Sequence, residues 1–453
     1  MQTIKNIALA YLKFWAKKSL ALHNPIIIGI AGSVGKSSTR NAIEAILKDH
    51  FKVKSIGNSE TGIPLGILGM TPESYTTLEW LKLCTSAPLK LNYLKGTKYL
   101  IAEMGIDDPY PPKNMEYLLT ILKPDISIVL NESATHTQQF EKALTPRQLE
   151  MSPKDKTELL IQKITEEDTK IITESGCKTG IYNADNYYIT KKLTEDTKKI
   201  PANLMSFGET GINNISFGNY EVSTKGTLFS FSFKYADHEN MIKLHFPNHI
   251  LPKEYREVFA AAILTAMETG LALEQIIASL EKNLTLPKSR SGLFKGINNT
   301  LIIDSSYNAS KSSTLAFLAL VKKLKANTKR PVAFVFGDMR ELGNAARLEH
   351  EDVADNTKGI VDYLFLVGTL TREYVLPVIQ EDEEKFKEVR WFNNSLRAGE
   401  FLKENLPKNA IVLFKGSQNT IFLEEAIKEV LEDKKDIKNL CRQSDFWMRQ
   451  KKN

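Results

Sequence analysis

The chain has little cysteine, no long apolar run and no internal repeat. Its three cysteines, Cys84, Cys177 and Cys441, lie far apart in 453 residues. An odd, scattered set forms neither a disulfide framework nor a metal-ligand spacing, and it favours a reducing compartment. No segment approaches the roughly eighteen apolar residues of a membrane span, and the N-terminus lacks the apolar core of a signal peptide. We therefore expect a cytoplasmic protein.

An excess of one charge is also absent. Lys and Arg number 60 against 54 for Asp and Glu, which gives a net charge of +6. So small a surplus, spread along the chain, does not favour nucleic acid as a partner.

The first 24 residues do carry a pattern. Six apolar or small residues recur at helical spacing among four lysines: Ile4, Ile7, Ala8, Tyr11, Leu12 and Trp15, with Lys5, Lys13, Lys17 and Lys18. This pattern predicts a basic amphipathic helix over residues 1–24. Such a helix could lie on an anionic membrane surface. We favour the alternative, in which it docks on its own domain.

Apolar strand-like runs alternate with helical stretches from residue 25 onward, which predicts an α/β fold. A central domain over 25–287 should hold a mostly parallel sheet, with a polar insertion near 141–165 on its surface and antiparallel hairpins over 206–246. Five further strand-like runs, each followed by a helical pattern, predict a C-terminal Rossmann-like domain over 288–453. The basic segment after Asp433 should be a helix end and a frayed terminus.

Residues 26–39 read IIIGIAGSVGKSST, an apolar run that breaks into a glycine-rich turn before a helix. Backbone N–H groups of such a turn wrap polyphosphate oxygens, Lys36 can reach the β and γ phosphates, and the Ser37 hydroxyl can hold Mg²⁺. Ile30 stands where the strict phosphate-loop pattern has glycine. The segment predicts a site for a nucleoside triphosphate with Mg²⁺.

Polar residues follow two other strands of the central domain. Glu103 ends one apolar run, and Asn131 and His136 follow another. Ligands of open α/β sheets bind beyond the carboxyl ends of the strands. A carboxylate and an imidazole at that edge could complete a Mg²⁺ shell beside the phosphate loop.

The ordered series of motifs resembles the Mur ligase family over about residues 25–430. The matching segments are 32–37 (GSVGKS), 58–64 (NSETGIP), 103–105 (EMG), 131–136 (NESATH), 183–185 (NAD), 304–309 (DSSYNA), 337–343 (GDMRELG), His350 and 415–417 (KGS). Within the family, the order and spacing are most similar to members that add D-alanyl-D-alanine to a cell-wall precursor.

The resemblance implies a role for each motif. Lys36 would contact the β and γ phosphates of ATP, Ser37 and Glu103 would hold one Mg²⁺, and His136 a second. The implied nucleotide-binding residues are Gly32, Ser33, Gly35, Lys36, Ser37, Ser38, Arg290, Asp304, Tyr307 and Asn308. The implied substrate-binding residues, which would meet an amino acid or dipeptide, are Asp338, Glu341, His350, Lys415 and Ser417.

The sequence departs from the family's pattern at several places. Only residues 1–24 precede the first strand, where the family normally has a domain that grips a UDP-sugar. Many members bridge two metal ions with a carbamylated lysine, and the equivalent place falls at Asp168, whose carboxylate could replace the carbamate. A solvated helix acid is the alternative interpretation of Asp168. Glu257 stands where an adenine-contacting asparagine is expected.

The resemblance implies an ATP-dependent amide ligase that acts through an acyl phosphate, with Lys36, His136, Arg290 and Asp168 in catalytic positions. We expect it to be a monomer that adds D-alanyl-D-alanine or an amino acid to a peptidoglycan precursor. Two alternatives remain open: a ligase of the folylpolyglutamate or poly-γ-glutamate type, and an ATP-binding partner subunit that has lost catalysis.

Overall fold

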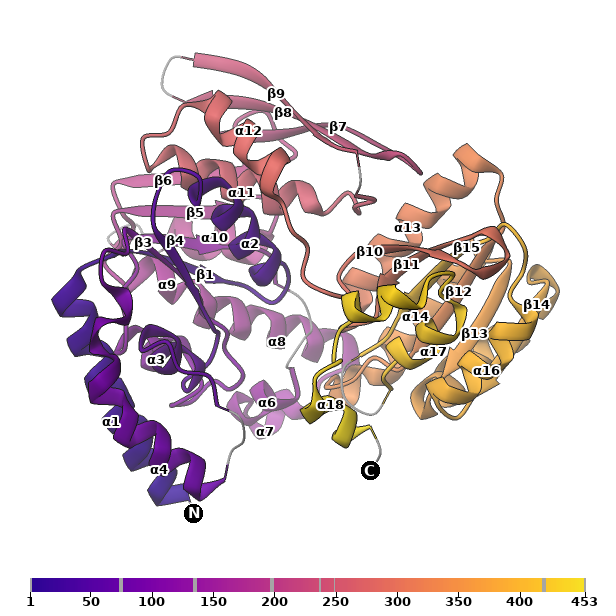
Figure 1. Ribbon diagram of the computed structural model, residues 1–453, viewed down its shortest axis with the longest axis horizontal. Helices are drawn as coiled ribbons and strands as arrows, with labels where there is room; N and C mark the ends of the chain where they lie inside the picture. The colour runs from indigo at the N-terminus through magenta and orange to yellow at the C-terminus, as the bar shows by residue number, and fades with distance from the viewer. Residues whose placement is uncertain are drawn as a thin grey trace. The chain divides into compact units, whose positions relative to one another are not determined.

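The computed structural model describes residues 2–72, 76–132, 137–195, 199–235, 238–247, 249–417 and 421–451. The chain forms two units (Figure 1). Unit 1 comprises Met1–Gly218, Ser230–Ile242 and Arg256–Thr285, and unit 2 comprises Asn219–Phe229, Lys243–Tyr255 and Leu286–Asn453.

Unit 1 contains the first six strands and parts of the last three strands of a sheet in the order β2-β3-β1-β4-β5-β6-β7-β8-β9. Its strands are β1 (Ile26–Ala31), β2 (Val53–Ile56), β3 (Tyr99–Glu103), β4 (Ile126–Val129), β5 (Thr179–Asn183), β6 (Asn203–Gly208), β7 (Ile215–Ser223), β8 (Gly226–Tyr235) and β9 (His238–Phe246). Neighbours from β2 to β7 pair in parallel. From β1 the chain runs to β2 and back to β3 on one side of β1, and it then crosses to β4 on the other side. Strand β1 therefore marks the topological switch point where ligands of such sheets bind.

Helices cover the sheet of unit 1. They are α1 (Gln2–His23), α2 (Lys36–Leu47), α3 (Gly62–Ile67), α4 (Thr77–Ser86), α5 (Met115–Leu119), α6 (Thr137–Phe140), α7 (Pro146–Leu149), α8 (Pro153–Asp168), α9 (Lys170–Thr173), α10 (Tyr187–Glu195), α11 (Tyr255–Met267) and α12 (Leu273–Asn283), with the 3-10 helix η1 (Ala87–Leu94). Strand β1 is a nearly continuous apolar run because helices flank it on both faces. A Cβ at Gly29 would lie 2.4 Å from Pro124, so only glycine fits this approach.

The expected N-terminal helix forms as α1 and docks on its own unit. Leu12 and Ala16 are fully buried, and Ser19 donates a hydrogen bond of 2.9 Å to the Leu91 carbonyl. Leu12 packs with Leu65 and Leu68 in a small apolar cluster. The favoured interpretation of residues 1–24 is therefore confirmed.

The polar segment near 141–165 is more than a surface insertion. Leu144, Leu160 and Ile164 belong to the main apolar core of unit 1. Helix α8 presents Leu160 and Ile164 inward, one turn apart, while its charged residues near the N-terminus remain exposed. The high charge of the segment obscured the short apolar stripe, and the expectation of a surface insertion is corrected accordingly.

Unit 2 contains a sheet in the order β10-β11-β15-β12-β13-β14. The strands are β10 (Gly292–Gly296), β11 (Thr300–Ser305), β12 (Val332–Gly337), β13 (Tyr363–Val367), β14 (Glu388–Phe392) and β15 (Ile411–Lys415). The main helices are α13 (Lys311–Thr328), α14 (Ala346–Thr357), α15 (Leu376–Gln380), α16 (Ser395–Asn405), α17 (Glu424–Val430) and α18 (Asp445–Gln450). Only the pair β10–β11 is antiparallel. Apolar cores lie on both faces of this sheet, as a Rossmann-like domain requires.

The segment after Asp433, expected to fray, is anchored instead. Leu440 and Cys441 are buried, and the Arg442 side chain is 3% exposed. Its buried acidic partner, Glu424, lies eighteen residues earlier in the chain. The expectation of a frayed terminus was wrong because the local composition does not reveal a pairing between residues this far apart.

Within the described ranges, no helix combines the length and apolar character that crossing a bilayer requires.

Candidate nucleotide and substrate sites

The phosphate-loop turn lies between β1 and α2, at the carboxyl edge of the sheet. Gly32 and Gly35 adopt positive φ angles of 126° and 95°, which side chains other than glycine rarely take. The Ser33 amide donates to the Asn131 carbonyl at 3.0 Å, so the turn is held against the end of β4. The Lys36 ammonium donates to the Gly32 carbonyl, folded back over the turn. A backbone in this form aims its N–H groups outward and suits an anion.

Ser37 and Glu103 meet, as expected for residues at neighbouring strand ends. Ile30 in β1 pairs with Glu103 in β3, and the Ser37 hydroxyl donates to the Glu103 carboxylate at 2.9 Å. Arg40, one turn further along α2, forms an ion pair of 2.6 Å with the same carboxylate. The pattern analysis did not single out Arg40, although its spacing from Lys36 places both on one helix face.

A pair of buried carboxyl groups lies beside Lys36. Glu132 directly follows Asn131 and accepts a hydrogen bond of 2.7 Å from the Ser33 hydroxyl. Asp168, the last residue of α8, is 2% exposed and adjoins it. Among the residues the structure describes, no N–H or hydroxyl group donates to Glu132 Oε1 or Asp168 Oδ1, and the two carboxyl groups are in contact with each other. Sequence reasoning missed Glu132, even though it follows a strand end as Asn131 does.

Burial raises the pKa of both carboxyl groups, and that of Asp168 most. The Glu132 carboxylate adds to the rise at Asp168, while the Lys36 ammonium opposes it. Two buried carboxyls at close range disfavour double ionisation. A cation placed between them would remove that repulsion.

Glu167, the residue before Asp168, fixes the position of the end of α8. Glu167 accepts hydrogen bonds from the Met115 and Glu116 amides at the start of α5, at 2.9 and 3.3 Å. Lys170 closes the arrangement with an ion pair of 2.7 Å to Glu167. Asp168 is thus held toward the phosphate loop rather than into solvent.

His136, the expected second metal ligand, lies outside the described residues. Among the described residues, no group of three or more histidine, cysteine or acidic side chains is arranged to hold a metal on its own. Mg²⁺ commonly takes only one or two carboxylates and completes its shell with phosphate oxygens and water. The oxygen donors of Ser37, Glu103, Glu132 and Asp168 fit that chemistry.

In unit 2, Asp304 is the penultimate residue of β11 and is fully buried. Its carboxylate accepts hydrogen bonds from the Ser289 hydroxyl at 2.6 Å and from the Ser306 amide and hydroxyl at 3.0 and 2.6 Å. Burial nevertheless raises its pKa. The Arg290 guanidinium lies 4.8 Å from the centre of the Tyr307 ring, a cation–π contact. Arg290, in the segment before β10, therefore meets the loop after β11 that carries Tyr307 and Asn308.

Lys415 ends the neighbouring strand β15 and is 2% exposed. It donates to the Asn308 carbonyl at 2.5 Å and is paired in register with Ser305. Burial, with repulsion from Arg290, lowers its pKa to about 7 despite the opposing effect of Asp304.

Three more of the expected substrate residues brace the loop after β12. Asp338 accepts hydrogen bonds from the Thr369 and Thr371 amides at 3.1 and 2.8 Å. The Ser417 hydroxyl accepts from the Arg340 amide at 3.0 Å. His350 is fully buried, accepts from the Met339 amide at Nε2 and contacts the Ala346 carbonyl through Nδ1. Those contacts require the neutral tautomer with the proton on Nδ1.

Glu341 differs from this group. It is exposed on the same loop at a positive φ of 64°. Its side chain is presented to solvent, where the others face inward.

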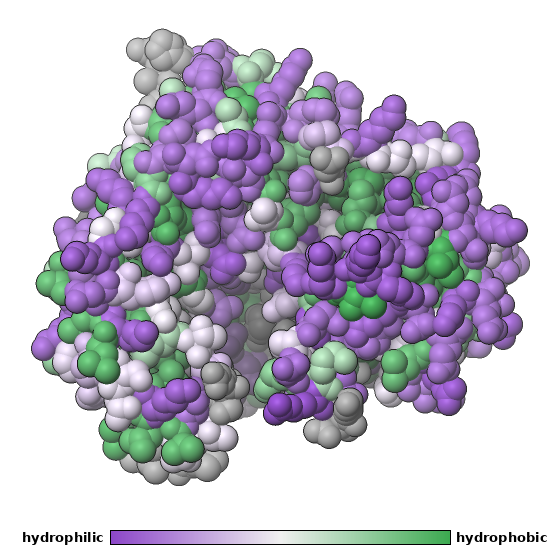
Figure 2. Space-filling view, in the orientation of Figure 1, coloured by the Kyte–Doolittle hydropathy of each residue, from purple (hydrophilic) through white to green (hydrophobic). Residues whose placement is uncertain are grey.

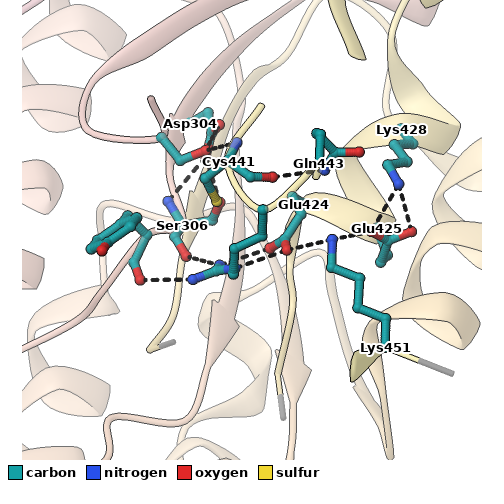
Figure 3. Close-up of polar contacts among 11 residues, drawn as sticks. Asp304, Ser306, Glu424, Glu425, Lys428, Cys441, Gln443 and Lys451 are labelled. Carbon is teal, nitrogen blue, oxygen red and sulfur yellow. Dashed lines mark hydrogen bonds and ion pairs between the residues drawn. The ribbon is translucent and has the colours of Figure 1, made fainter. Parts of the chain in front are cut away.

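A charged network anchors the C-terminal segment to the Asp304 loop (Figure 3). Arg442 contacts Glu424 at 2.7 Å and donates to the Ser306 and Tyr307 carbonyls at 3.0 and 3.2 Å. Lys451 reaches the other Glu424 oxygen at 2.7 Å. Although burial opposes it, these two cations hold the pKa of Glu424 below its usual value. The network fixes the backbone that carries Tyr307.

Comparison with known proteins agrees with this arrangement. The Mur ligase middle domain matches residues 30–152, and the glutamate ligase domain of Mur ligases matches residues 289–418. The chain therefore belongs to the Mur ligase family.

Two similar relatives carry the same name, UDP-N-acetylmuramoyl-tripeptide–D-alanyl-D-alanine ligase. The protein from Bacillus subtilis is 25% identical over 90% of this chain and 76% of its own length. That from Buchnera aphidicola is 24% identical over 93% of this chain and 79% of its own length.

Among solved structures, MurF ligase from Thermotoga maritima in complex with ADP matches with a TM-score of 0.70 at 19% identity, over 93% of this chain and 83% of that one. A pseudomurein peptide ligase type C from Methanothermus fervidus matches with a TM-score of 0.57 at 16% identity, over 89% and 78%. The fold expected from the sequence, a P-loop α/β domain followed by a Rossmann-like domain, is confirmed.

Proposed function

We propose that the chain is an ATP-dependent amide ligase that joins D-alanyl-D-alanine to a UDP-N-acetylmuramoyl tripeptide. The observation that carries the proposal is the cluster of Lys36, Ser37 and Glu103 at the switch point of the first sheet. The names of the relatives supply the acceptor and the dipeptide.

The reaction would run in two steps. A carboxylate oxygen of the acceptor attacks the γ phosphorus of ATP, the bond to the β-bridging oxygen breaks, and ADP leaves. The amine of the dipeptide then attacks the acyl-phosphate carbonyl and loses a proton, and inorganic phosphate departs as the amide forms. In such chemistry the protein's contribution is chiefly positioning and charge neutralisation.

Lys36 and the loop amides would take the β and γ phosphates. Ser37 and Glu103 would hold one Mg²⁺, which neutralises charge on the phosphates when bound. The contacting carboxyl groups of Glu132 and Asp168 suit a second cation, with His136 as a further ligand. Asp168 would then take the place of the family's carbamylated lysine, with Glu132 beside it.

In unit 2 we assign a role to each predicted site residue from the exposure of its side chain and from its hydrogen bonds. Arg290, Tyr307 and Asn308 would meet the nucleotide. Asp304 would shape their loop because its buried carboxylate already accepts hydrogen bonds from Ser289 and Ser306. Asp338, His350 and Ser417 are engaged in the same way, so we assign them as positioning residues of the loop after β12. Glu341, which is exposed there, would be nearer the incoming dipeptide. Lys415 is buried and donates to the Asn308 carbonyl, so it would position the loop that carries Tyr307 and Asn308.

The test is phosphate release from ATP with purified full-length chain. UDP-N-acetylmuramoyl tripeptide plus D-alanyl-D-alanine should stimulate release, and Lys36→Ala should abolish it. Lys408→Ala, at an exposed lysine of unit 2, is the matched control and should be unchanged. Stimulation by a folate or polyglutamyl acceptor with glutamate would reassign the acceptor. ATP binding without release with any pair would indicate the non-catalytic subunit.

The reaction consumes ATP and a nucleotide-linked precursor, both of which are made in the cytoplasm, so we infer that location. The three cysteines are free, in agreement with a reducing compartment.

A further inference from the structure

An apolar surface of unit 1 contains none of the residues assigned to the proposed chemistry. It is formed by α1, α4 and η1, which pack against one another. Its exposed large side chains, with the exposed fraction of each, are Ile7 66%, Phe14 52%, Leu22 61%, Leu78 77%, Leu81 61% and Leu89 85%. In Figure 2, hydrophobic surface gathers over the end of the molecule where Figure 1 places α1 and α4.

The exposed side chains of α1 form a stripe rather than a scatter. Ile7, Tyr11, Phe14, Lys18 and Leu22 recur every three or four residues, so they share one helix face. Leu12 and Ala16 lie on another face and are buried in unit 1. Helix α1 therefore has two apolar faces. One of them packs on the core of unit 1, and the other is exposed.

The charge beside this stripe is of one sign. Helix α1 contains four lysines and no acidic residue. Lys18 lies 4.8 and 5.0 Å from the ring centres of Phe14 and Trp15, so its stem follows the apolar stripe while its ammonium stays at the edge. In the described part of the chain, no carboxylate forms an ion pair with Lys17 or Lys18.

A groove of about 520 Å³ opens next to α1. Lys13, Lys17 and Lys123 line it, and no acidic residue does. Burial and the nearby Lys17 lower the pKa of Lys13, as expected where positive charges gather without compensation. The groove offers hydrogen-bond donors to a phosphate group next to a surface that suits acyl chains.

We propose that the surface formed by α1, α4 and η1 docks peripherally on an anionic lipid bilayer. The exposed apolar stripe would enter the level of the headgroups, and the lysines of α1 and of the groove would meet lipid phosphates. A helix with this composition binds membranes through buried apolar area together with attraction to anionic lipids. The proposal does not depend on the ligase activity, because none of these residues belongs to the proposed site.

The experiment is flotation of full-length protein, without nucleotide, with phosphatidylcholine vesicles that contain or lack phosphatidylglycerol. We expect flotation only with the anionic vesicles, and weaker flotation at high salt. Lys17→Glu/Lys18→Glu should weaken binding by at least about five-fold for each lysine. Phe14→Gln/Leu81→Gln should also release the protein, and both changes are at exposed positions that leave the fold intact.

Matched controls are at exposed residues that do not belong to the proposed surface. Lys322→Glu/Lys408→Glu repeats the charge change in unit 2, and Ile212→Gln replaces a side chain that is 92% exposed. Both should float like the unaltered chain. Failure of the unaltered chain to float with anionic vesicles would overturn the proposal. Self-association in sedimentation that Phe14→Gln/Leu81→Gln abolishes, without flotation, would instead assign the surface to a second copy of the chain. Phosphate release, measured separately, tests the ligase proposal independently.

Discussion

At the scale of single residues, the most informative position is Asp168. It is buried in contact with the Glu132 carboxyl group, where a solvated helix acid would be exposed and hydrated. Replacement by asparagine keeps the shape but removes the charge that would hold a cation. We expect Asp168→Asn to lower Mg²⁺-dependent ATP turnover by about ten-fold or more, measured as phosphate release across a Mg²⁺ titration.

Two further variants sharpen this test. Glu158→Gln changes an exposed acid on the same helix and should leave turnover unchanged. Asp168→Lys should be inactive in bicarbonate-free buffer and regain activity when bicarbonate is added, because a carbamylated lysine again presents an anionic group. Normal Mg²⁺ dependence of Asp168→Asn would contradict the assigned role.

Lys415 gives a prediction for pH dependence. In the folded chain its pKa is about 7, against 10.5 for an ordinary lysine. Between these values the unfolded state binds the extra proton, so this residue makes the free energy of unfolding rise with pH across that window. Lys415→Met should flatten the rise by an amount on the order of a few kcal/mol, measured by chemical denaturation from neutral to alkaline pH.

The measurement is a difference between two chains, so that other groups titrating in the same range cancel. Lys408→Met, at an exposed lysine in the same unit, should keep the pH profile of the unaltered chain. Identical profiles for Lys415→Met and the unaltered chain would show that Lys415 keeps its proton in the folded state.

At the scale of elements, the C-terminal segment is held by buried ion pairs of Arg442 and Lys451 with Glu424. Glu424 is fully buried, and Arg442 → Gln would leave it with Lys451 alone. Removing one partner of a buried pair costs about 3–5 kcal/mol, whereas an exposed pair contributes about 1 kcal/mol or less. We expect a marked drop in the melting temperature of unit 2 by calorimetry, and faster proteolysis after residue 433.

Arg397→Gln is the control, because Arg397 is 70% exposed and pairs with Glu400 on one helix. It should shift the melting temperature little. Equal effects of the two substitutions would mean that the network of Figure 3 does not anchor the segment.

Elements whose identity depends on local pattern could be predicted from sequence. The run at 26–31 and the glycines at 32 and 35 place a strand and a phosphate loop at the observed positions. Because the carboxyl ends of parallel strands lie at one edge of a sheet, the contact between Ser37 and Glu103 could also be predicted.

What escaped prediction depends on contacts between distant segments. Strands β2, β5 and β10 are four or five residues long and lack a strong apolar pattern, so tertiary pairing decides them. The proximity of Glu132 to Asp168 and the pairing of Arg442 with Glu424 are likewise set by packing, which local spacing does not encode.

At the scale of the whole molecule, nucleotide binding should be visible as stability. A ligand that binds only the folded state stabilises it by about 2.7 kcal/mol at one hundred times its dissociation constant. For a domain the size of unit 1, that corresponds to roughly 5 °C in melting temperature. We expect Mg²⁺ with ATP to raise the melting temperature of unit 1 in the full chain by this order, measured by calorimetry.

Lys36→Met should remove most of this shift, because the loop then loses the charge that faces the phosphates while its glycine turn is unchanged. Lys322→Met, at an exposed lysine of unit 2, should keep the shift. Adenosine, which has the base and ribose but no phosphate, should give little shift with either chain if the phosphates supply most of the binding energy. A shift of equal size for Lys36→Met and the unaltered chain would mean that ATP binds somewhere other than the turn at residues 32–37.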